Sequence, residues 1–297
     1  METGKLIVCA AKVNETIRAN ASEFLKASTM QELNDAYTEA GYWSRAAGDF
    51  IAGGRQRLWR GFSDELYRAQ LAAWLPLRPE ERILKTDLFD EAVSAGLVGG
   101  LLGAARQVHG IDLSPAVVRA ARARYPDLDA QEADVRALPF PDGHFNTILS
   151  NSTLDHFRDR ADIGVSLREL CRVLEPGGRL FITLDNLANP AIFIRQMLPF
   201  RLFNRLGILP YYTGATLGPR GMGLALGDAG FRVVRMAPAA HVPRLPAVWL
   251  CRLLERRLGD TGARRLVDAM KRWEVLGRWP TRNWTGYYVA ALAEKHA

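Results

Sequence analysis

A regular alternation of short apolar runs and amphipathic helical stretches is the feature that most constrains the fold of this chain. The stretches Pro115–Tyr125 and Ala161–Leu174 have helical periodicity, and they separate apolar runs that are too short to be helices. Such alternation predicts a parallel sheet that is covered by helices on both faces. The predicted strands of this sheet are Arg82–Asp87, Gln107–Asp112, Leu128–Glu132, Phe145–Ser150 and Gly178–Asp185.

Beyond Asp185 the alternation continues, but with an interruption. Phe231–Ala237 and Tyr287–Ala293 both have strand character, and residues 246–278 between them have a basic, helical composition. Residues 187–219 are rich in Pro, Phe, Tyr and Gly, which predicts a cap or a substrate wall. We therefore predict an α/β fold with a Rossmann-like, doubly wound sheet. It is mostly parallel, ends in an antiparallel strand and carries a helical insertion before that strand.

The first part of the chain lacks strand alternation and is predicted to be helical. Its apolar side chains fall near helical spacing, and Pro76 and Pro79 then interrupt the pattern. We expect residues 1–78 to form an N-terminal helical cap or lid, and residues 79–297 to form the Rossmann-like domain.

Composition restricts the setting in which this 297-residue chain works. Hydrophobic residues make up 48% of it and charged residues 24%, which is ordinary for a soluble globular protein. Cys9, Cys171 and Cys251 lie far apart and form no CxxC pair, which predicts a reducing compartment and no metal site. No apolar run is long enough for a signal sequence or a membrane span, so we expect a cytoplasmic location.

The formal net charge of +7 predicts attraction to acidic ligands or surfaces. Part of this charge is local, because nine Arg or Lys residues stand against four acidic residues between positions 251 and 284. Apolar side chains such as Trp249 and Leu253 accompany them. This pattern permits peripheral membrane contact through the late helices. A solvated helix packed on the domain is the alternative interpretation.

Polar side chains follow three of the predicted strands at the points where these strands end. Asp112 follows the second strand, Asp134 the third and Asn151 the fourth. In folds that bind nucleosides, a carboxylate at the position of Asp112 accepts hydrogen bonds from both ribose hydroxyls. The alternative is a capping turn, in which Ser114 caps the next helix and Pro115 occupies its first position.

Four segments in order resemble class I S-adenosylmethionine-dependent methyltransferases: GIDLSPAVVRAARARYP, EADVRALPFPDGHFN, SNSTLDHF and RELCRVLEPGGRLFITL. The resemblance covers residues 82–185 well. It implies that the cofactor is S-adenosyl-L-methionine, with Asp112 and Leu113 at the ribose. Asp134 and Val135 would then lie at the adenine, and Asn151 beside the methionine moiety and the transferred methyl group.

The first motif departs from this family. Its members end the first strand with an acidic residue that is followed by GxGxG, where glycine permits close approach of the backbone to the methionine end. This chain has KTDLFDE from Lys85 to Glu91, with no glycine before Gly96. Direct alignment places Lys85 at the acidic position, which is electrostatically wrong for an ammonium group. We therefore expect Asp87, with backbone near Gly96, to bind the cofactor, and loss of cofactor binding is the alternative.

The residues after the fourth strand also supply candidates for catalysis. His156 is the best candidate for a general base, because histidine titrates near neutrality, and Asp155 precedes it. The alternative is a packing or capping pair at the start of the next helix. Farther along, Asp185, Asn186 and Asn189 either line an acceptor site or form Asx turns.

The predicted reaction is methyl transfer to a small, partly hydrophobic acceptor by in-line displacement. One rival is a methyltransferase-like protein that binds cofactor or regulates without catalysis. A second rival is a nucleic-acid methyltransferase, which the positive charge favours. Against it, SNSTLDHF lacks the (D/N)PPY-type tetrapeptide of many base-amine methyltransferases, and no RNA-binding module is visible, so nucleic acid is not the expected partner. Tyr211 and Tyr212 would serve as an aromatic acceptor wall or as core residues.

Overall fold

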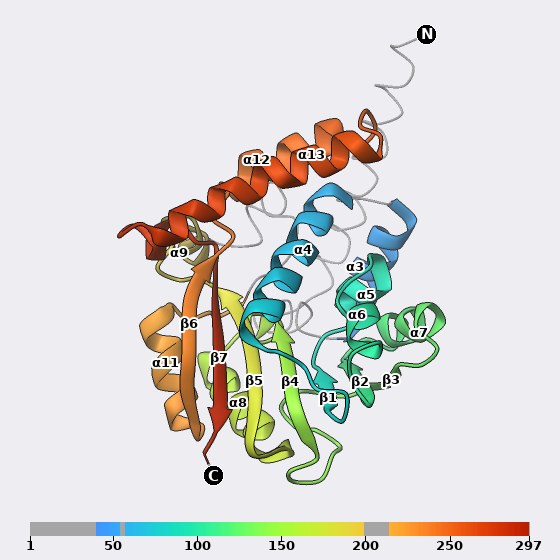
Figure 1. Cartoon of the computed structure of the whole chain (residues 1–297), viewed down its shortest axis with the longest axis vertical. Coiled ribbons are helices and arrows are strands. Elements are labelled where there is room, and N and C mark those ends of the chain that lie inside the picture. The colour runs from blue at the N-terminus through green and yellow to red at the C-terminus, as the bar shows by residue number, and fades with distance from the viewer. Residues whose placement is uncertain (1–39, 54–56, 199–213, 297) are drawn as a thin grey trace, which may run out of the picture.

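A computed structural model describes residues 40–53, 57–198 and 214–296 of the chain. They form a seven-stranded sheet with the strand order β3-β2-β1-β4-β5-β7-β6 and helices on both faces (Figure 1). Strands β1 to β5 pair in parallel, and β7 lies antiparallel to both β5 and β6. The Rossmann-like, mostly parallel sheet with an antiparallel final strand is therefore confirmed. The strands are β1 Arg82–Lys85, β2 Gln107–Asp112, β3 Asp129–Glu132, β4 Phe145–Asn151, β5 Leu174–Asp185, β6 Phe231–Ala239 and β7 Tyr288–Lys295.

The helices precede, connect and follow these strands. In the N-terminal part and the first half of the sheet they are α3 Ala40–Gly53, α4 Arg57–Trp74, α5 Phe89–Val93, α6 Val98–Leu102, α7 Pro115–Arg124, the 3₁₀ helix η1 Leu154–His156 and α8 Arg160–Val173. In the later part they are α9 Pro190–Met197, α11 Pro219–Asp228, α12 Arg244–Leu254, α13 Asp260–Lys271, the 3₁₀ helix η2 Arg272–Arg278 and α14 Arg282–Thr285.

Two apolar layers hold the sheet between its helices. Successive residues of a strand point to opposite faces, so Ile148 of β4 joins the layer under α8 and α11, whereas Leu149 joins the layer under α4, α6 and α7. Both side chains are fully buried, and burial of one such side chain contributes about 1.5–3 kcal/mol. This two-sided burial explains why the central strands are continuous apolar runs instead of alternating ones.

Every strand except β2 differs from the sequence prediction by one to four residues at one or both ends. Strand β1 ends at Lys85 and not at Asp87. The backbone leaves the strand after Lys85, and the N–H of Leu88 then donates to the side chain of Asp112 at the end of β2. Strand β5 begins at Leu174 and not at Gly178. The predicted cap before α7 is confirmed, since Oγ of Ser114 accepts a hydrogen bond from the backbone N–H of Val117 at 3.3 Å.

The insertion before the last strand forms a hairpin of two helices, α12 and α13, at the end of the sheet toward which β4, β5 and β6 point (Figure 1). Both helices pack on α4, where Ala247, Cys251 and Val267 share one apolar cluster with Phe62. An ion pair between Lys271 and Glu65, 2.9 Å long, adds to this contact. Among the described residues, no helix combines the length and apolar character needed to span a bilayer.

Candidate active site

A cavity of about 780 Å³ opens at the edge of the sheet where β1, β2, β3 and β4 end. Its volume lies within the range of about 300–1,000 Å³ that is typical of small-molecule sites. Helix α3, the segment after β1, the ends of β2 and β3 and the region of η1 all contribute to its wall. The predicted site residues that line it are Asp87, Asp112, Leu113, Asp134, Val135 and His156.

Asp112 presents a buried carboxylate to this cavity at the end of β2. Its Oδ1 accepts a hydrogen bond from the backbone N–H of Ser114 at 2.8 Å, and Oδ2 accepts one from Leu88 at 3.1 Å. A carboxylate has about four acceptor positions, so two remain for a ligand. Burial raises the pKa of Asp112 to about 6, although these two N–H groups oppose the shift. The group is therefore ionised at neutral pH.

Asp134 lines the cavity after β3 and is held by Arg136, which the sequence analysis did not single out. Nε of Arg136 lies 3.1 and 3.0 Å from Oδ1 and Oδ2 of Asp134, and Nη2 lies 2.6 Å from Oδ2. Burial opposes ionisation, but these hydrogen bonds outweigh it and lower the pKa of Asp134. The guanidinium also lies 5.1 Å above the ring of Phe157. Together these side chains form a charged wall beside the backbone of Val135.

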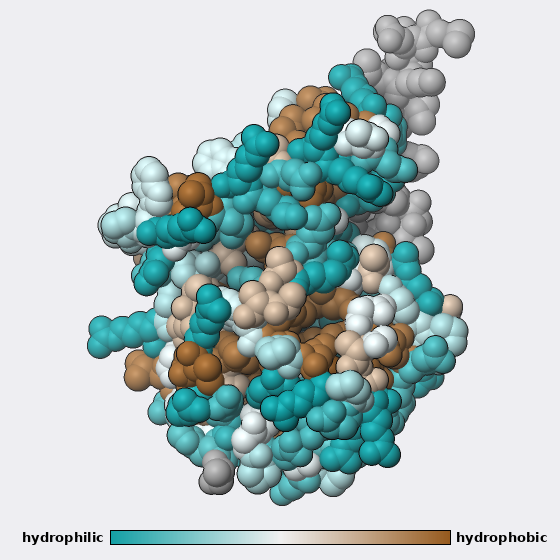
Figure 2. All heavy atoms as spheres, in the orientation of Figure 1, coloured by the Kyte–Doolittle hydropathy of each residue, from teal (hydrophilic) through white to brown (hydrophobic). Residues whose placement is uncertain are grey.

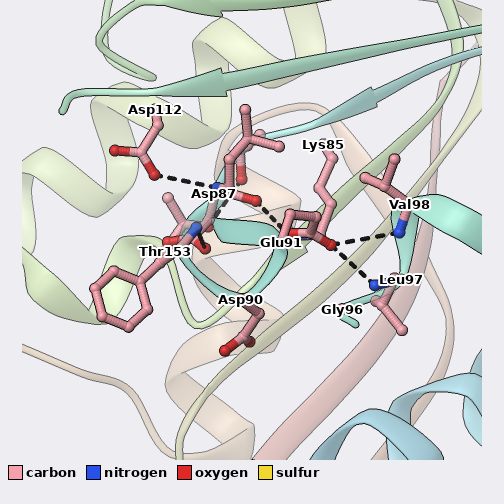
Figure 3. A network of polar contacts seen from close by, with 12 residues as sticks. Lys85, Asp87, Asp90, Glu91, Gly96, Leu97, Val98, Asp112 and Thr153 are labelled. Carbon is pink, nitrogen blue, oxygen red and sulfur yellow. Dashed lines mark hydrogen bonds and ion pairs between the residues drawn. The ribbon is translucent and has the colours of Figure 1, made fainter. Parts of the chain in front are cut away.

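The segment after β1 contains a buried network of charges in place of a glycine-rich loop. Nζ of Lys85 lies 2.8 Å from Oε2 of Glu91, with both side chains almost fully buried, and it also donates to the backbone oxygen of Asp87 (Figure 3). Burial favours the neutral amine, but the carboxylates of Glu91 and Asp87 outweigh it and raise the pKa of Lys85. The lysine that aligns with the family's acidic position is thus already paired, and it does not line the cavity.

Asp87 reaches the cavity from the same segment. Its Oδ1 accepts a hydrogen bond from the backbone N–H of Phe89 at 3.0 Å. Burial raises the pKa of Asp87 well above its ordinary value, the Lys85 ammonium lowers it and the Asp112 carboxylate raises it again. A cationic ligand group in the cavity would favour the ionised form of this side chain.

Gly96, which the sequence analysis places near the methionine end of the cofactor, lies behind the segment after β1. Gly96 does not line the cavity, and its N–H donates to Oδ2 of Asp64 at 3.2 Å. Its φ is +55°, and a Cβ there would lie 2.4 Å from Oε1 of Glu91. The glycine therefore makes room for Glu91, whose Oε1 accepts hydrogen bonds from the backbone of Leu97 and Val98 (Figure 3).

A second glycine compensates for the side chain of Leu88, which stands where the family has loop glycines. Leu88 is fully buried in the apolar layer under α6 and α7. It packs against Gly110 on β2, where a Cβ would lie 2.6 Å from Cδ2 of Leu88. Gly110 on the neighbouring strand therefore makes room for the Leu88 side chain in this layer.

Asp155 and His156 lie together beyond β4, in and beside the cavity. Oδ2 of Asp155 accepts a hydrogen bond from the backbone N–H of Asp185 at 2.9 Å, and Oδ1 lies 3.9 Å from Nε2 of His156. Burial and then the Asp185 carboxylate raise the pKa of Asp155 to about 6. The imidazole packs against Trp43 of α3 at 4.6 Å between ring centroids. Among the described residues, its buried Nδ1 has no hydrogen-bond partner.

Asn151 ends β4 with a buried amide, although it does not line the cavity. Neither polar atom of this amide has a hydrogen-bond partner in the described part of the chain. Leaving such a group unpaired costs about 1–3 kcal/mol. Nearby, Oγ1 of Thr86 donates to Ser150 at 3.0 Å and lies 2.9 Å from Oγ1 of Thr153. Thr86 and Thr153 line the cavity, and the sequence analysis missed both.

The polar residues after β5 form an ion pair and turns that stabilise the fold. Asp185 forms an ion pair with Arg195 of α9. The side-chain oxygens of Asn186 and Asn189 each accept a hydrogen bond from the backbone N–H two residues later, at 3.0 and 2.9 Å. Both asparagines thus form the Asx turns that were one of their two interpretations. None of the three lines the cavity, and Tyr211 and Tyr212 lie outside the described residues.

Comparison with known proteins identifies the family. A protein-family model described as a methyltransferase domain matches residues 91–182. The chain is 34% identical over 182 residues to EEF1A lysine methyltransferase 4 of Mus musculus, a match that covers 56% of this chain and 68% of that protein. It is 27% identical over 201 residues to a probable S-adenosylmethionine-dependent methyltransferase of Mycobacterium tuberculosis. This match covers 67% of this chain and 65% of that protein. The chain belongs to the S-adenosylmethionine-dependent methyltransferases.

Solved structures agree on the fold. A methyltransferase in complex with the Trm112 methyltransferase activator of Haloferax volcanii superposes with a TM-score of 0.55 at 17% identity. That match covers 86% of this chain and 98% of the other. The prediction of a class I methyltransferase that uses S-adenosyl-L-methionine is therefore confirmed. The matched regions span about two thirds of the length of the two curated relatives.

The cavity suits this cofactor chemically. It presents ionised acceptor oxygens of Asp112 for hydroxyl groups, and an Asp87 carboxylate whose ionised form a cation favours. The residues present thus match a nucleoside that carries a charged amino acid.

Proposed function

We propose that Asp112, Leu113, Asp134 and Val135 hold the nucleoside of S-adenosylmethionine. The two free acceptor positions of Asp112 suit the two ribose hydroxyls. The carboxylate of Asp134 suits the adenine amine, and the N–H of Val135 suits a ring nitrogen. Their common position in one cavity, at the ends of the adjacent strands β2 and β3, is the observation that carries this assignment.

For the methionine end, we assign the amino group to Asp87 and the adjoining contacts to Asn151. The high pKa of Asp87 supports this assignment, because an ammonium group would relieve the cost of its ionisation. The amide of Asn151 supports it as well, since its buried donor and acceptor have no partner among the described residues. In this proposal Lys85, Glu91 and Gly96 shape the segment without touching the cofactor.

We further propose that the acceptor is a small, partly hydrophobic molecule. The cavity wall beside His156 is aromatic, with Trp43, Phe89 and Phe157 around it. Trp43 lies 6.1 Å from Phe89 and 4.6 Å from His156 between ring centroids. Such a wall offers apolar contact area and one imidazole, which suits an acceptor with a short polar end on an apolar body.

When bound, S-adenosylmethionine supplies a methyl group on a positively charged sulfur, which the acceptor displaces in line. The protein mainly aligns the acceptor with the methyl group, and such positioning lowers the activation barrier by about 7–11 kcal/mol. His156 then takes the acceptor's proton, a role worth about 10²–10⁴-fold in rate. Asp155, 3.9 Å from Nε2, stabilises the resulting imidazolium.

A protein lysine is the second candidate acceptor, because the relative in Mus musculus is named a lysine methyltransferase. The same base would serve an amine, so the two candidates differ in the size of the acceptor and not in the chemistry. A lysine side chain would have to fit a cavity that Trp43 and Phe157 line.

Methyl transfer from radiolabelled S-adenosylmethionine distinguishes these proposals. The purified protein is incubated with a lysate of its own source that has been separated into small molecules and proteins. We expect label in the small-molecule fraction, in the part that partitions into organic solvent. Label in protein alone would contradict a small acceptor and support the lysine. The Asp112→Ala variant, which should bind the cofactor poorly, is the control for background transfer.

A further inference from the structure

The α12–α13 hairpin and the segment that follows it carry an unusual set of exposed side chains. Four tryptophans, Trp249, Trp273, Trp279 and Trp284, are between 45% and 65% exposed. Isolated apolar side chains are common on protein surfaces, but several large ones gathered in one region mark an interaction site. We call the exposed side chains of residues 244–285 the basic-aromatic surface.

Helix α12 has two apolar faces. Packing on α4 explains the inner face, but it does not explain the outer one. Ala247 and Cys251 face the apolar cluster on α4. Leu245, Trp249 and Leu253, spaced four residues apart, form a second stripe and are 74%, 65% and 44% exposed. A surface helix ordinarily has one apolar face and one polar face. Within the described part of the chain, the inner face of α12 packs on α4 and the outer stripe stays exposed.

The charge of the same surface is strongly positive. Asp260 and Asp268 are the exposed acidic residues within the fully described stretch 244–285. Figure 2 shows hydrophobic and strongly hydrophilic side chains next to one another over the hairpin. The exposed arginines of α12, of the turn between α12 and α13, of α13 and of the start of η2 are Arg252, Arg256, Arg257, Arg264, Arg265 and Arg272.

We propose that the basic-aromatic surface docks on an anionic phospholipid membrane. Tryptophan prefers the headgroup region, leucine prefers the acyl boundary, and arginine binds lipid phosphates, so the three residue types match one partner. A nucleic acid would satisfy the arginines but would leave the stripe of Leu245 and Leu253 in water. The combination of the apolar stripe on α12 with the arginines on and after this helix therefore favours lipid.

The position of this surface fits a peripheral enzyme. The hairpin lies at the end of the sheet toward which β4 and β5 point, and these strands end at the side where the cavity opens (Figure 1). Docking would therefore hold the molecule with the cavity side near the membrane. The docking proposal itself does not depend on the identity of the acceptor.

Flotation of the whole protein with lipid vesicles tests this proposal. Vesicles of phosphatidylcholine, with or without phosphatidylglycerol, are compared at low and high salt. We expect binding to the vesicles that contain phosphatidylglycerol, and weaker binding at high salt. The triple variant Arg252→Glu, Arg256→Glu, Arg257→Glu should reduce it roughly a hundredfold or more. The double variant Trp249→Ala, Trp284→Ala should reduce it by about tenfold or more.

Matched controls exclude general effects of charge and hydrophobicity. Arg119→Glu with Arg124→Glu on α7 changes exposed charges elsewhere, and Leu224→Ala on α11 removes a 62% exposed apolar side chain. Both controls should bind vesicles like the unchanged protein. Affinity for S-adenosylhomocysteine and the midpoint of thermal unfolding should be the same in all variants, which separates this test from that of the proposed function.

Three results would overturn the proposal. The first is absence of binding to anionic vesicles by the unchanged protein. The second is vesicle binding that the arginine variant loses and the tryptophan variant keeps, because that would be charge attraction without apolar docking. The third is binding of single-stranded RNA, measured by fluorescence anisotropy, in the absence of vesicle binding, which would assign the surface to nucleic acid.

Discussion

The carboxylate of Asp112 shows how one residue combines a structural and a binding role. It accepts hydrogen bonds from Leu88 and Ser114, and so it joins the segment after β1 to the end of β2. Burial raises its pKa to about 6. Below that pH it is protonated, and it then loses acceptor capacity for the ribose hydroxyls.

We therefore predict that affinity for S-adenosylhomocysteine falls as the pH drops through about 6. Well below this value, the dissociation constant should rise about tenfold per pH unit if only the ionised form binds. Isothermal titration between neutral and mildly acidic pH measures it. In Asp112→Asn, affinity should be weaker by about tenfold or more at neutral pH and should vary less with pH. An unchanged pH profile in this variant would remove Asp112 from the ribose site.

His156 is predicted to affect turnover and not cofactor affinity. His156→Asn should lower the rate of methyl transfer by about 10²-fold or more, because the acceptor's proton then has no base. Its affinity for S-adenosylhomocysteine should remain close to that of the unchanged protein. Single-turnover assays together with isothermal titration give both quantities. Equal turnover in the variant would leave His156 and Asp155 as a packing pair.

Sequence reasoning located part of this site and missed another part. Asp112, Leu113, Asp134 and Val135 were predictable, because parallel strands deliver their carboxyl ends to one edge and the strand pattern fixes those ends. Arg136, Thr86, Thr153 and Trp43 also line the cavity. Their participation depends on side-chain rotamers and on the docking of α3, which no local pattern encodes.

At the scale of elements, the segment between β1 and α6 has a buried ion pair and two space-making glycines where the family has a glycine-rich loop. Lys85 and Glu91 neutralise each other, and Gly96 makes room for Glu91. Gly110 makes room for Leu88 from the neighbouring strand. The sequence revealed that the loop was altered. It did not reveal these compensations, because they join residues up to 22 positions apart.

Breaking the Lys85–Glu91 pair on one side should be costly. Glu91→Gln leaves the Lys85 ammonium buried without its counter-charge, so we expect the free energy of unfolding to fall by about 3–5 kcal/mol. Adding Lys85→Met should recover part of that loss, because the buried ammonium is then removed as well. Urea unfolding measures both variants.

The pair between Arg232 and Glu294 offers a matched control for this experiment. The side chain of Arg232 is 62% exposed, so Glu294→Gln should cost less than about 1 kcal/mol. A cost of that size for Glu91→Gln as well would show that the buried network contributes little to the fold. No recovery in the double variant would show that Lys85 and Glu91 act independently.

At the scale of the whole molecule, the cavity joins segments that are distant in sequence. Trp43 of α3, Asp87 after β1, Asp112 of β2, Asp134 after β3 and His156 of η1 all line it. The sheet order that brings most of them together was predictable from the alternation of strands and helices. An N-terminal helical cap was also expected, but the sequence did not reveal which contacts it makes, such as that of Trp43 with His156.

Because one ligand would contact all these segments, its binding should stabilise the whole fold. S-adenosylhomocysteine at a hundred times its dissociation constant should raise the free energy of unfolding by about 2.7 kcal/mol. Thermal unfolding with and without the ligand measures this gain. Trp43→Ala should reduce it, because this side chain lines the cavity and packs on His156. Trp279→Ala, which removes a 57% exposed tryptophan away from the cavity wall, should keep the full gain. An equal gain in all three proteins would show that α3 packs beside the cavity without taking part in ligand binding.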